Sequence, residues 1–339
     1  MITEISSAER PPDTREARTA FSRLGIAVFV MLIVTYGVQI LAGIALGRAG
    51  IRNVIVLLLL SYVPMYCVAF PAGYLIMRSV PKYPLELRDL GAGRFFRLLV
   101  ICFFLMYGGN LFGNLVNAVI SDLLGISITD PVESLVTGGI PMPALFVLTV
   151  ILAPFFEELF FRKLLIDRMN VYGQGTAIIA TAVMFGLFHG NLSQFFYAMA
   201  LGLVFGYIYV KTGKLRYSVF MHMIINFWGG IVSGSLVTNE SISALINGGF
   251  DPEDAAEMFS LITPAVALFF LYTIVTLALA VAGLVLFFRH SRSISLETAE
   301  MQIPKGHSFR TAWLNAGMIL FTIACFAMMA LTVFKDLLL

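Results

Sequence analysis

The chain has few charged residues. Only 12% of its 339 residues are Asp, Glu, Lys or Arg, whereas 59% are hydrophobic and the mean hydropathy is +0.90. A soluble domain carries about 25% charged residues. The composition therefore excludes an ordinary soluble protein and predicts an all-α fold, a polytopic membrane helix bundle. The basic residues are scattered through loops, so no nucleic-acid partner is expected.

The chain is also poor in cysteine and lacks the pattern of a cleaved leader. Its three cysteines, Cys67, Cys102 and Cys325, all lie in apolar runs. They give neither a disulfide framework nor a cysteine metal site. Residues 1–21 are polar and mixed in charge, with no short apolar core before a small-residue cleavage site. We expect a cytoplasmic N-terminal tail there, followed by a first apolar run that stays as a membrane helix.

Nine apolar runs are long enough, or nearly so, to cross a bilayer, which takes about 20 residues. They cover roughly residues 22–47, 52–78, 95–124, 142–168, 174–190, 192–211, 215–237, 261–288 and 312–335. The fifth and sixth are short and meet at Gly190, so eight to nine spans are expected. We divide the chain into N-terminal helices (22–141), a four-helix core (142–232) and C-terminal helices (233–339) with a cytoplasmic linker at 290–310.

The loop charges predict the orientation. With the N-terminus in the cytoplasm, 19 of the 22 Lys and Arg residues fall on the inside. The three on the outside are Arg48, Arg52 and Lys335. This asymmetry follows the positive-inside rule. We therefore expect a multi-pass protein of a prokaryotic cell membrane, with the N-terminus inside and the C-terminus outside.

Two outer loops carry signals for the start of a helix. Asp130-Pro131 and Asp251-Pro252 each place a capping acid before a proline at the first helical position. We expect a helix to begin at each site. The linker at 290–310 is polar and contains no recognisable motif.

Few ionisable residues lie inside the predicted spans. They are Glu157, Glu158, Arg162, His189 and His222, and all fall between residues 157 and 222. Each charge in a bilayer costs a few kcal/mol on insertion scales, so such residues usually serve a function.

Depth estimates bring these residues to a similar level. At about 1.5 Å per residue, Glu157 lies roughly 16 Å from the inner end of its span, His189 roughly 22 Å and His222 roughly 10 Å. Asn226, one turn after His222, lies roughly 16 Å deep. We expect one cluster, reached from the cytoplasmic side.

Each element of this cluster also has an ordinary structural explanation. Glu157 and Glu158 could be a solvated pair near a helix end that Arg162 marks. His189 could cap a helix beside Gly190. His222 and Asn226 could form the interhelical hydrogen bonds that are common in membrane bundles.

Three motifs in order favour a functional reading. They are Glu157-Glu158-Leu159-Phe160-Phe161-Arg162, Phe185-Gly186-Leu187-Phe188-His189 and His222-Met223-Ile224-Ile225-Asn226. This pattern resembles the CAAX-protease and bacteriocin-processing (CPBP, or ABI) family of intramembrane endopeptidases, which includes type II CAAX prenyl endopeptidases. The resemblance covers roughly 142–232. The sequence departs from it at Lys163, where many members carry glycine.

The resemblance implies a peptidase mechanism that suits these residue types. Peptide hydrolysis needs an activated water, a proton donor and groups that hold an oxyanion. Glu157 and His189 would activate the water, while His222 and Asn226 would form the oxyanion hole. Glu158 and Arg162, spaced i and i+4, are expected to pair. Together with Phe185 they would serve structure or substrate orientation.

The implied substrate is a peptide or lipid-modified protein: a prenylated tail, a leader peptide or a segment of a membrane protein. The sequence does not choose among these. Membrane lipids are the other expected partners, and the sequence does not indicate the oligomeric state of the protein. No cofactor is expected. The alternative is a zinc site with Glu157, His189 and His222 as ligands, although the H-E-x-x-H pair that usually anchors such a site is absent.

Two non-proteolytic functions remain open. One is a non-catalytic immunity or scaffold membrane protein with the same fold. The other is a proton-coupled carrier, because buried Glu and His also form proton relays. The carrier is disfavoured, since the ionisable residues gather in one place and no internal repeat is evident.

Overall fold

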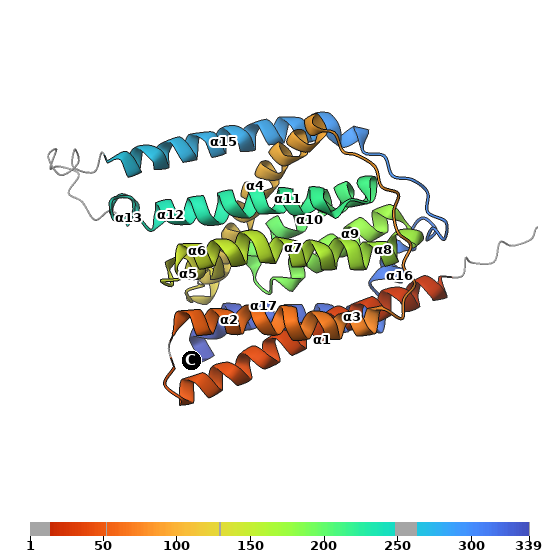
Figure 1. Cartoon of the computed structure of the whole chain (residues 1–339), viewed down its shortest axis with the longest axis horizontal. Coiled ribbons are helices and arrows are strands. Elements are labelled where there is room, and N and C mark those ends of the chain that lie inside the picture. The colour runs from red at the N-terminus through yellow and green to blue at the C-terminus, as the bar shows by residue number, and fades with distance from the viewer. Residues whose placement is uncertain (1–13, 52, 129, 248–262, 339) are drawn as a thin grey trace, which may run out of the picture.

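The computed structural model describes residues 14–51, 53–128, 130–247 and 263–338. Within these ranges the chain is all-α: every regular element is a helix, and the helices lie roughly along one direction as a bundle (Figure 1). The described residues contain eight helical rods that are long and apolar enough to cross a membrane. The chain is thus a polytopic helical membrane protein.

Several of these rods consist of consecutive elements without a break. The bounds are α1 Arg15–Arg48; α2 Val54–Pro64, η1 Met65–Ala69 and α3 Phe70–Met77; α4 Ala92–Leu124; α6 Met142–Phe146, η2 Val147–Leu152, α7 Ala153–Glu158, η3 Leu159–Ile166, α8 Asp167–Met169 and η4 Asn170–Tyr172; α10 Leu192–Thr212; α11 Leu215–Asn226, η5 Phe227–Val232 and α12 Ser233–Val237; α15 Pro264–His290; and α17 Ala316–Leu338. The shorter helices are α5 Pro131–Thr137, α9 Gln174–Phe188, α13 Glu240–Asn247, η6 Ser291–Ser293 and α16 Ser308–Ala312.

The expected spans agree with these rods apart from a few boundaries. α1 begins at Arg15 rather than near 22, because the helix continues past the apolar stretch among charged residues. The fifth expected span is α9, whose 15 residues reach only about 22 Å. The helix start predicted at Asp130-Pro131 is confirmed as α5. The one predicted at Asp251-Pro252 lies outside the described residues.

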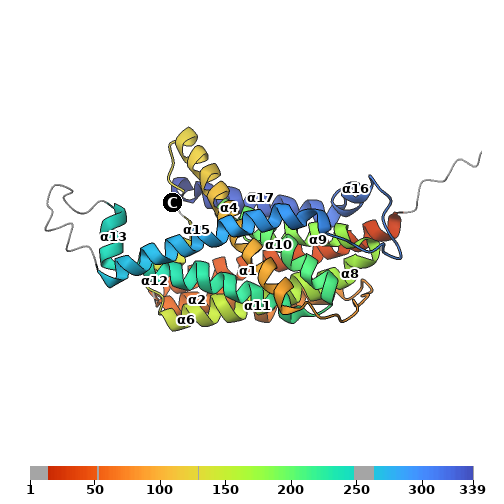
Figure 2. The same ribbon diagram turned by 90° about the horizontal axis from the view of Figure 1, so that it is seen from above.

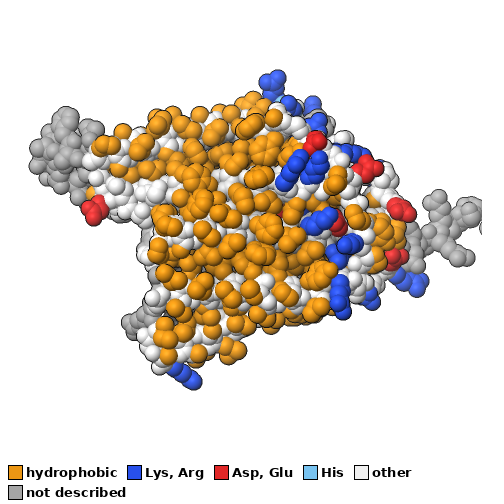
Figure 3. All heavy atoms as spheres, viewed as in Figure 1, with side chains coloured by type: hydrophobic (Ala, Val, Ile, Leu, Met, Phe, Trp, Pro, Cys, Tyr) orange, Lys and Arg blue, Asp and Glu red, His pale blue; other side chains and the backbone are white. Residues whose placement is uncertain are grey.

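The charged side chains mark the two ends of the bundle. Lys and Arg gather at the right-hand end of Figure 3, beyond a broad hydrophobic belt. We call this the basic end; the 79–91 and 294–307 segments lie there (Figure 1). The opposite, distal end carries α5 and α13. The positive-inside rule predicts that the basic end faces the cytoplasm.

Small residues let distant helices approach closely. α1 and α17, at opposite ends of the chain, meet at Gly25 and Gly317: a Cβ on Gly25 would lie 2.5 Å from the Gly317 carbonyl carbon. Ser22 Oγ accepts a hydrogen bond from Gly317 N at 3.1 Å. α4 crosses the bundle obliquely (Figure 2) and meets α10 at Gly109 and Gly113. Such contacts take the place of hydrophobic burial as the packing force in lipid.

Two segments cover the basic end of the core helices. In the first, Tyr83 N donates to Asp167 O (2.6 Å) and Arg88 N donates to Thr212 O (2.8 Å). In the second, Met301 N donates to Val171 O and Ile303 N to Tyr172 O, and the Ile303 side chain is buried. The predicted linker at 290–310 is therefore docked on the core at these points.

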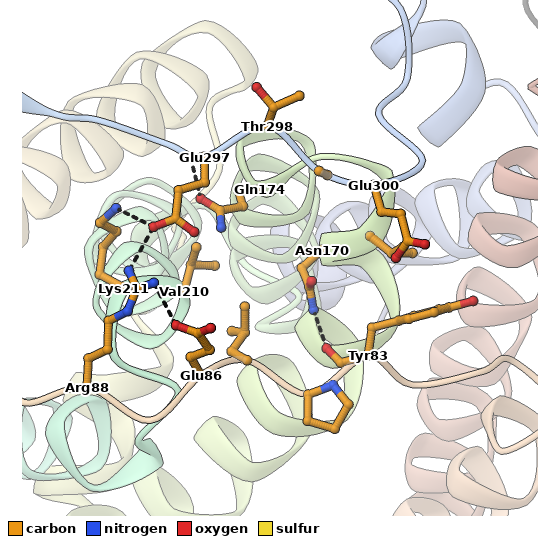
Figure 4. Close-up of a pocket in the computed structure, with 14 residues that line it drawn as sticks. Tyr83, Glu86, Arg88, Asn170, Gln174, Val210, Lys211, Glu297, Thr298 and Glu300 are labelled. Carbon is orange, nitrogen blue, oxygen red and sulfur yellow. Dashed lines mark hydrogen bonds and ion pairs between the residues drawn. The ribbon is translucent and has the colours of Figure 1, made fainter.

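The two segments also meet each other. Glu297 accepts a hydrogen bond from Arg88 at 2.8 Å and lies 3.7 Å from Lys211 Nζ, and its backbone N–H donates to Gln174 Oε1 (Figure 4). Arg88 also pairs with Glu86 at 2.7 Å. These residues line a polar cavity of about 260 Å³. The ion pairs are exposed, so each contributes little stability alone.

Candidate active site

The helical rod from Met142 to Tyr172 carries the acidic pair and is locally unwound. Pro154 has no N–H, so the carbonyls four and five residues before it each lose a possible donor. The chain adopts a π-helical conformation over η2, which ends just before α7. One of those carbonyls, Thr149 O, accepts a hydrogen bond from Asn226 Nδ2 at 2.8 Å instead. The proline thereby creates the acceptor that fixes the Asn226 side chain.

Glu158 and Arg162 form the expected ion pair inside the protein. Arg162 Nε lies 3.0 Å from Glu158 Oε2, and both side chains are fully buried. The Arg162 guanidinium also faces the ring of Phe185, 5.0 Å from its centroid. Breaking a buried pair of this kind by removing one partner typically costs about 3–5 kcal/mol.

His222 lies between the two glutamates. Its Nδ1 is 3.2 Å from Glu158 Oε1, and its Nε2 is 3.8 Å from Glu157 Oε2. A carboxylate paired with arginine can only accept, so Nδ1 carries the hydrogen and donates. The imidazole ring also stacks on Phe205, with centroids 5.2 Å apart. The orientation of His222 is therefore fixed, and Nε2 faces Glu157.

His189 is held by the backbone of its own helix. Its Nδ1 lies 2.8 Å from Phe185 O, which can only accept, so Nδ1 donates and Nε2 is left for other partners. The Phe185 ring packs edge-on against both His189 and His222, with centroids 4.9 and 5.8 Å away. Phe185 thus contacts both motif histidines and Arg162.

The turn after His189 is fixed from two sides. Gly190 adopts a φ of +65°, which favours glycine. Asn191 caps α10 through its Oδ1 and donates from Nδ2 to His189 O at 2.9 Å. From α17, the Thr332 hydroxyl lies 3.1 Å from both Gly190 O and Met328 O of its own helix, so its one hydrogen is shared between these acceptors. The α9–α10 turn is thereby tied to α17.

The four predicted site residues line a single cavity of about 590 Å³. Glu157, His189, His222 and Asn226 share it with side chains from α1, α2, α4, α5 and α10. Glu157 is partly exposed in it, with 17% of its side chain accessible. The structure thus brings the members of all three motifs together.

The cavity extends from this cluster toward the distal end, where Asp130, Pro131 and Ser233 line it. On the basic side of Glu157 and Glu158, the rod is tightly packed. Phe160, Phe161 and Leu165 are 0–1% exposed. We expected access from the cytoplasmic side, and this geometry does not match that expectation. The expectation came from the depth of residues along their helices, and depth does not show which end of the bundle is filled by side chains.

The zinc alternative depends on how the possible metal ligands are grouped. Among the residues that the structure describes, no three His, Cys, Asp or Glu side chains are grouped as ligands would be. Glu157 and His222 approach each other through Oε2 and Nε2, 3.8 Å apart. No step below depends on a metal.

Sequence reasoning missed several residues of this site. Thr149 and Phe205 hold Asn226 and His222, yet each is an ordinary residue in an apolar run. Thr35 and Tyr62 line the cavity from α1 and α2, far from the motifs in sequence. Pro154 was the one available signal, because a proline inside a span frees a carbonyl.

A bundle of membrane-spanning helices that encloses Glu, His and Asn side chains in one cavity is the architecture expected of an intramembrane hydrolase. Residues 139–228 match a family described as Rce1-like, type II CAAX prenyl endopeptidase. The resemblance inferred from the three motifs is confirmed over this stretch.

One curated relative was also found. The chain is 27% identical over 89 residues to the "Putative membrane peptidase YdiL" of Bacillus subtilis (strain 168). The match covers 25% of this chain and 35% of the relative, so it spans about a third of that protein's length. No solved structure matches. Together the two matches support an intramembrane protease in general.

Proposed function

We propose that the protein is an intramembrane endopeptidase that hydrolyses a peptide bond with a water activated by Glu157 and His189. The observation that carries the proposal is the convergence of Glu157, His189, His222 and Asn226 on one cavity. Three of these four side chains, those of His189, His222 and Asn226, also form a hydrogen bond to a neighbouring residue, which limits their motion. Pre-positioned groups of this kind are what catalysis requires.

In the first step, Glu157 takes a proton from a water molecule in the cavity. The oxygen of that water forms a bond with the scissile carbonyl carbon, whose C=O electrons move to oxygen. His189 Nε2 lies free to accept a hydrogen bond from the same water, because Nδ1–H is bonded to Phe185 O. General acid–base groups of this kind contribute about 10²–10⁴-fold.

His222 and Asn226 stabilise the resulting oxyanion. Asn226 uses one Nδ2 hydrogen for Thr149 O and keeps the second for the substrate. His222 donates from Nδ1 to Glu158, so it can also donate from Nε2 only when both ring nitrogens carry hydrogen. The buried Glu158–Arg162 pair acts here as a positioning unit.

The tetrahedral intermediate then collapses. The C–N bond breaks, and the leaving nitrogen takes the proton that Glu157 received, directly or through His189. The products are a carboxylic acid and an amine, and the site returns to its starting state. No cofactor is needed in this scheme.

The test is cleavage of a quenched peptide library by purified protein. Glu157→Gln should lower the cleavage rate by about 10²–10⁴-fold, because the water loses its base. Glu300→Gln, an exposed acid at the basic end, is the matched control and should cleave like wild type. Equal cleavage by Glu157→Gln and wild type would disprove the mechanism.

Two alternatives have their own readouts. If the Glu157→Gln variant keeps the full cellular phenotype, a non-catalytic immunity or scaffold function replaces the peptidase. Metal analysis and chelator treatment of the purified protein address the zinc alternative with Glu157, His189 and His222. Activity that survives chelation supports the metal-free scheme, whereas stoichiometric zinc with chelator-sensitive cleavage overturns it.

A further inference from the structure

We infer that the substrate is a neutral or cationic, mainly apolar peptide segment that reaches the site from the distal, non-cytoplasmic end of the bundle. A carboxylate-terminated tail presented from the cytoplasm does not fit. The inference rests on the proposed function and names its substrate class. It depends on three observations: the direction of the cavity, its charge, and an unpartnered polar atom in its wall.

The direction of the cavity is the first observation. Glu157 and His222 lie at its inner limit, and its walls continue through Asn110 and Ser233 to Asp130 at the distal end. On the basic side of the cluster, Phe160 and Phe161 are buried, and the 79–91 and 294–307 segments cover the ends of the core helices. A substrate that used the basic end would have to displace this packing.

The predicted orientation of the protein tells which side of the membrane the cavity faces. Because 19 of the 22 Lys and Arg residues lie on the predicted inner side, the basic end faces the cytoplasm. Prenylated tails are made from cytoplasmic proteins and end in a free carboxylate. The cavity faces away from them.

The charge of the cavity is the second observation. Among the described residues that line it are two acids, Glu157 and Asp130, but neither Lys nor Arg. Its only basic side chains are the motif histidines, which the proposed reaction uses. A buried carboxylate needs a cationic or donor partner. A tail whose terminal carboxylate lies a few residues from the scissile bond would find no Lys or Arg there to neutralise it, whereas an internal segment carries no such charge.

The third observation is an unused polar atom in the wall. Thr35 of α1 lines the cavity, and its buried Oγ1 has no hydrogen-bond partner. Its residue is 4% exposed. Leaving such an atom unpaired costs about 1–3 kcal/mol, which a substrate peptide group would recover. The cavity volume of about 590 Å³ lies within the range of ligand sites.

Sidedness can be measured without relying on cleavage. In a chain with Cys67, Cys102 and Cys325 replaced by alanine, Ser233→Cys and Asn110→Cys each place a thiol in the cavity. A membrane-impermeant maleimide should label both in right-side-out vesicles and neither in inside-out vesicles. Thr298→Cys at the basic end is the control and should show the opposite pattern. Labelling of both cavity thiols from the inside-out face alone would overturn the inference.

Substrate chemistry is measured with the purified protein. We would compare one apolar peptide with both ends capped, the same peptide with a free C-terminal carboxylate, and its farnesylated free-acid form. The capped peptide should be cleaved fastest, and Thr35→Val should raise its KM with little change in kcat. Faster cleavage of the farnesylated acid overturns the substrate class. If Glu157→Gln still abolishes that cleavage, the peptidase proposal stands while this inference fails.

Discussion

Glu158 and His222 lie 64 residues apart in sequence, and their Oε1 and Nδ1 atoms are 3.2 Å apart in a fully buried setting. The same carboxylate pairs with Arg162. The second glutamate of the acidic pair therefore joins the arginine of its own motif to the histidine of another. Through this position, Glu158 can orient the histidine that the proposed mechanism uses.

Glu158→Gln should lower both stability and activity. It leaves the Arg162 charge buried without a partner, which typically costs about 3–5 kcal/mol. The double variant Glu158→Gln with Arg162→Met should recover most of that stability, because no unpaired charge remains. Thermal unfolding and kcat should separate the two effects. If the double variant also recovers full kcat, the negative charge of Glu158 is not needed to position His222.

Asn226→Ala should lower kcat by about 10²–10³-fold, the usual cost of one lost oxyanion donor. Asn226→Asp keeps the shape but supplies no N–H, so it should be similarly impaired. Stability should fall less, by about 1 kcal/mol, for the lost hydrogen bond to Thr149 O. An active Asn226→Asp variant would contradict the oxyanion role.

The turn after His189 should be sensitive to a residue in the last helix. Thr332→Val removes the hydrogen bond to Gly190 O while keeping the side-chain shape. Loss of about 1 kcal/mol of support should lower kcat roughly fivefold with KM nearly unchanged. Thr332→Ser keeps the hydroxyl and should restore kcat. A defect that Thr332→Ser does not rescue would indicate packing rather than positioning.

Gly190→Ala tests the same turn through the backbone. A side chain at φ +65° is strained by about 1–2 kcal/mol, and the added Cβ would lie 3.2 Å from the Tyr36 hydroxyl oxygen. The variant should lose kcat more than Thr332→Val. Gly47→Ala in α1, where an added Cβ meets open space, is the control. Unchanged kcat in Gly190→Ala would show that the turn geometry does not matter to His189.

The contact between the two basic-end segments should depend on pH. The hydrogen bond from Arg88 holds the pKa of Glu297 below its ordinary value of about 4.3. A lowered pKa stabilises the docked state above the unfolded-state pKa, and this contribution is lost as pH falls through the lowered value. Lys211 and Glu86 also face this group.

Hydrogen exchange at Met301 and Ile303, corrected for intrinsic rates, measures this docking. Protection should be constant at neutral pH and fall in acid below the ordinary glutamate range. Glu297→Gln should show weaker protection that no longer varies over that range. Identical pH profiles for wild type and Glu297→Gln would contradict the assignment to Glu297.

The helices could be predicted because a bilayer demands long apolar runs, and the three motifs could be found because charges are rare within them. The distances between the motifs could not. Asn226 is fixed by Thr149 O, a carbonyl that Pro154 leaves free in a π-helical turn. In an ideal α-helix that carbonyl would accept a backbone hydrogen bond, so the sequence pattern does not predict it as a partner of Asn226. His222 meets Glu158 across the bundle, which only tertiary packing decides.

The access side illustrates a second limit. Depth along a helix places Glu157, His189 and Asn226 at similar levels, which agrees with their position in one cavity. It does not reveal that Phe160 and Phe161 fill the basic side while the distal side stays open. Which end is filled depends on side chains from helices that carry no motif.

The hydrogen bond from Thr332 to Gly190 also sets an order of events during synthesis. At about 5–20 residues per second, a ribosome needs roughly 7–28 s to travel from Gly190 to Thr332. During that interval the chain carries all three motifs but lacks the helix that steadies the His189 turn. The hydrogen bond to Gly190 O can therefore form only after α17 has been made and has packed against the α9–α10 turn.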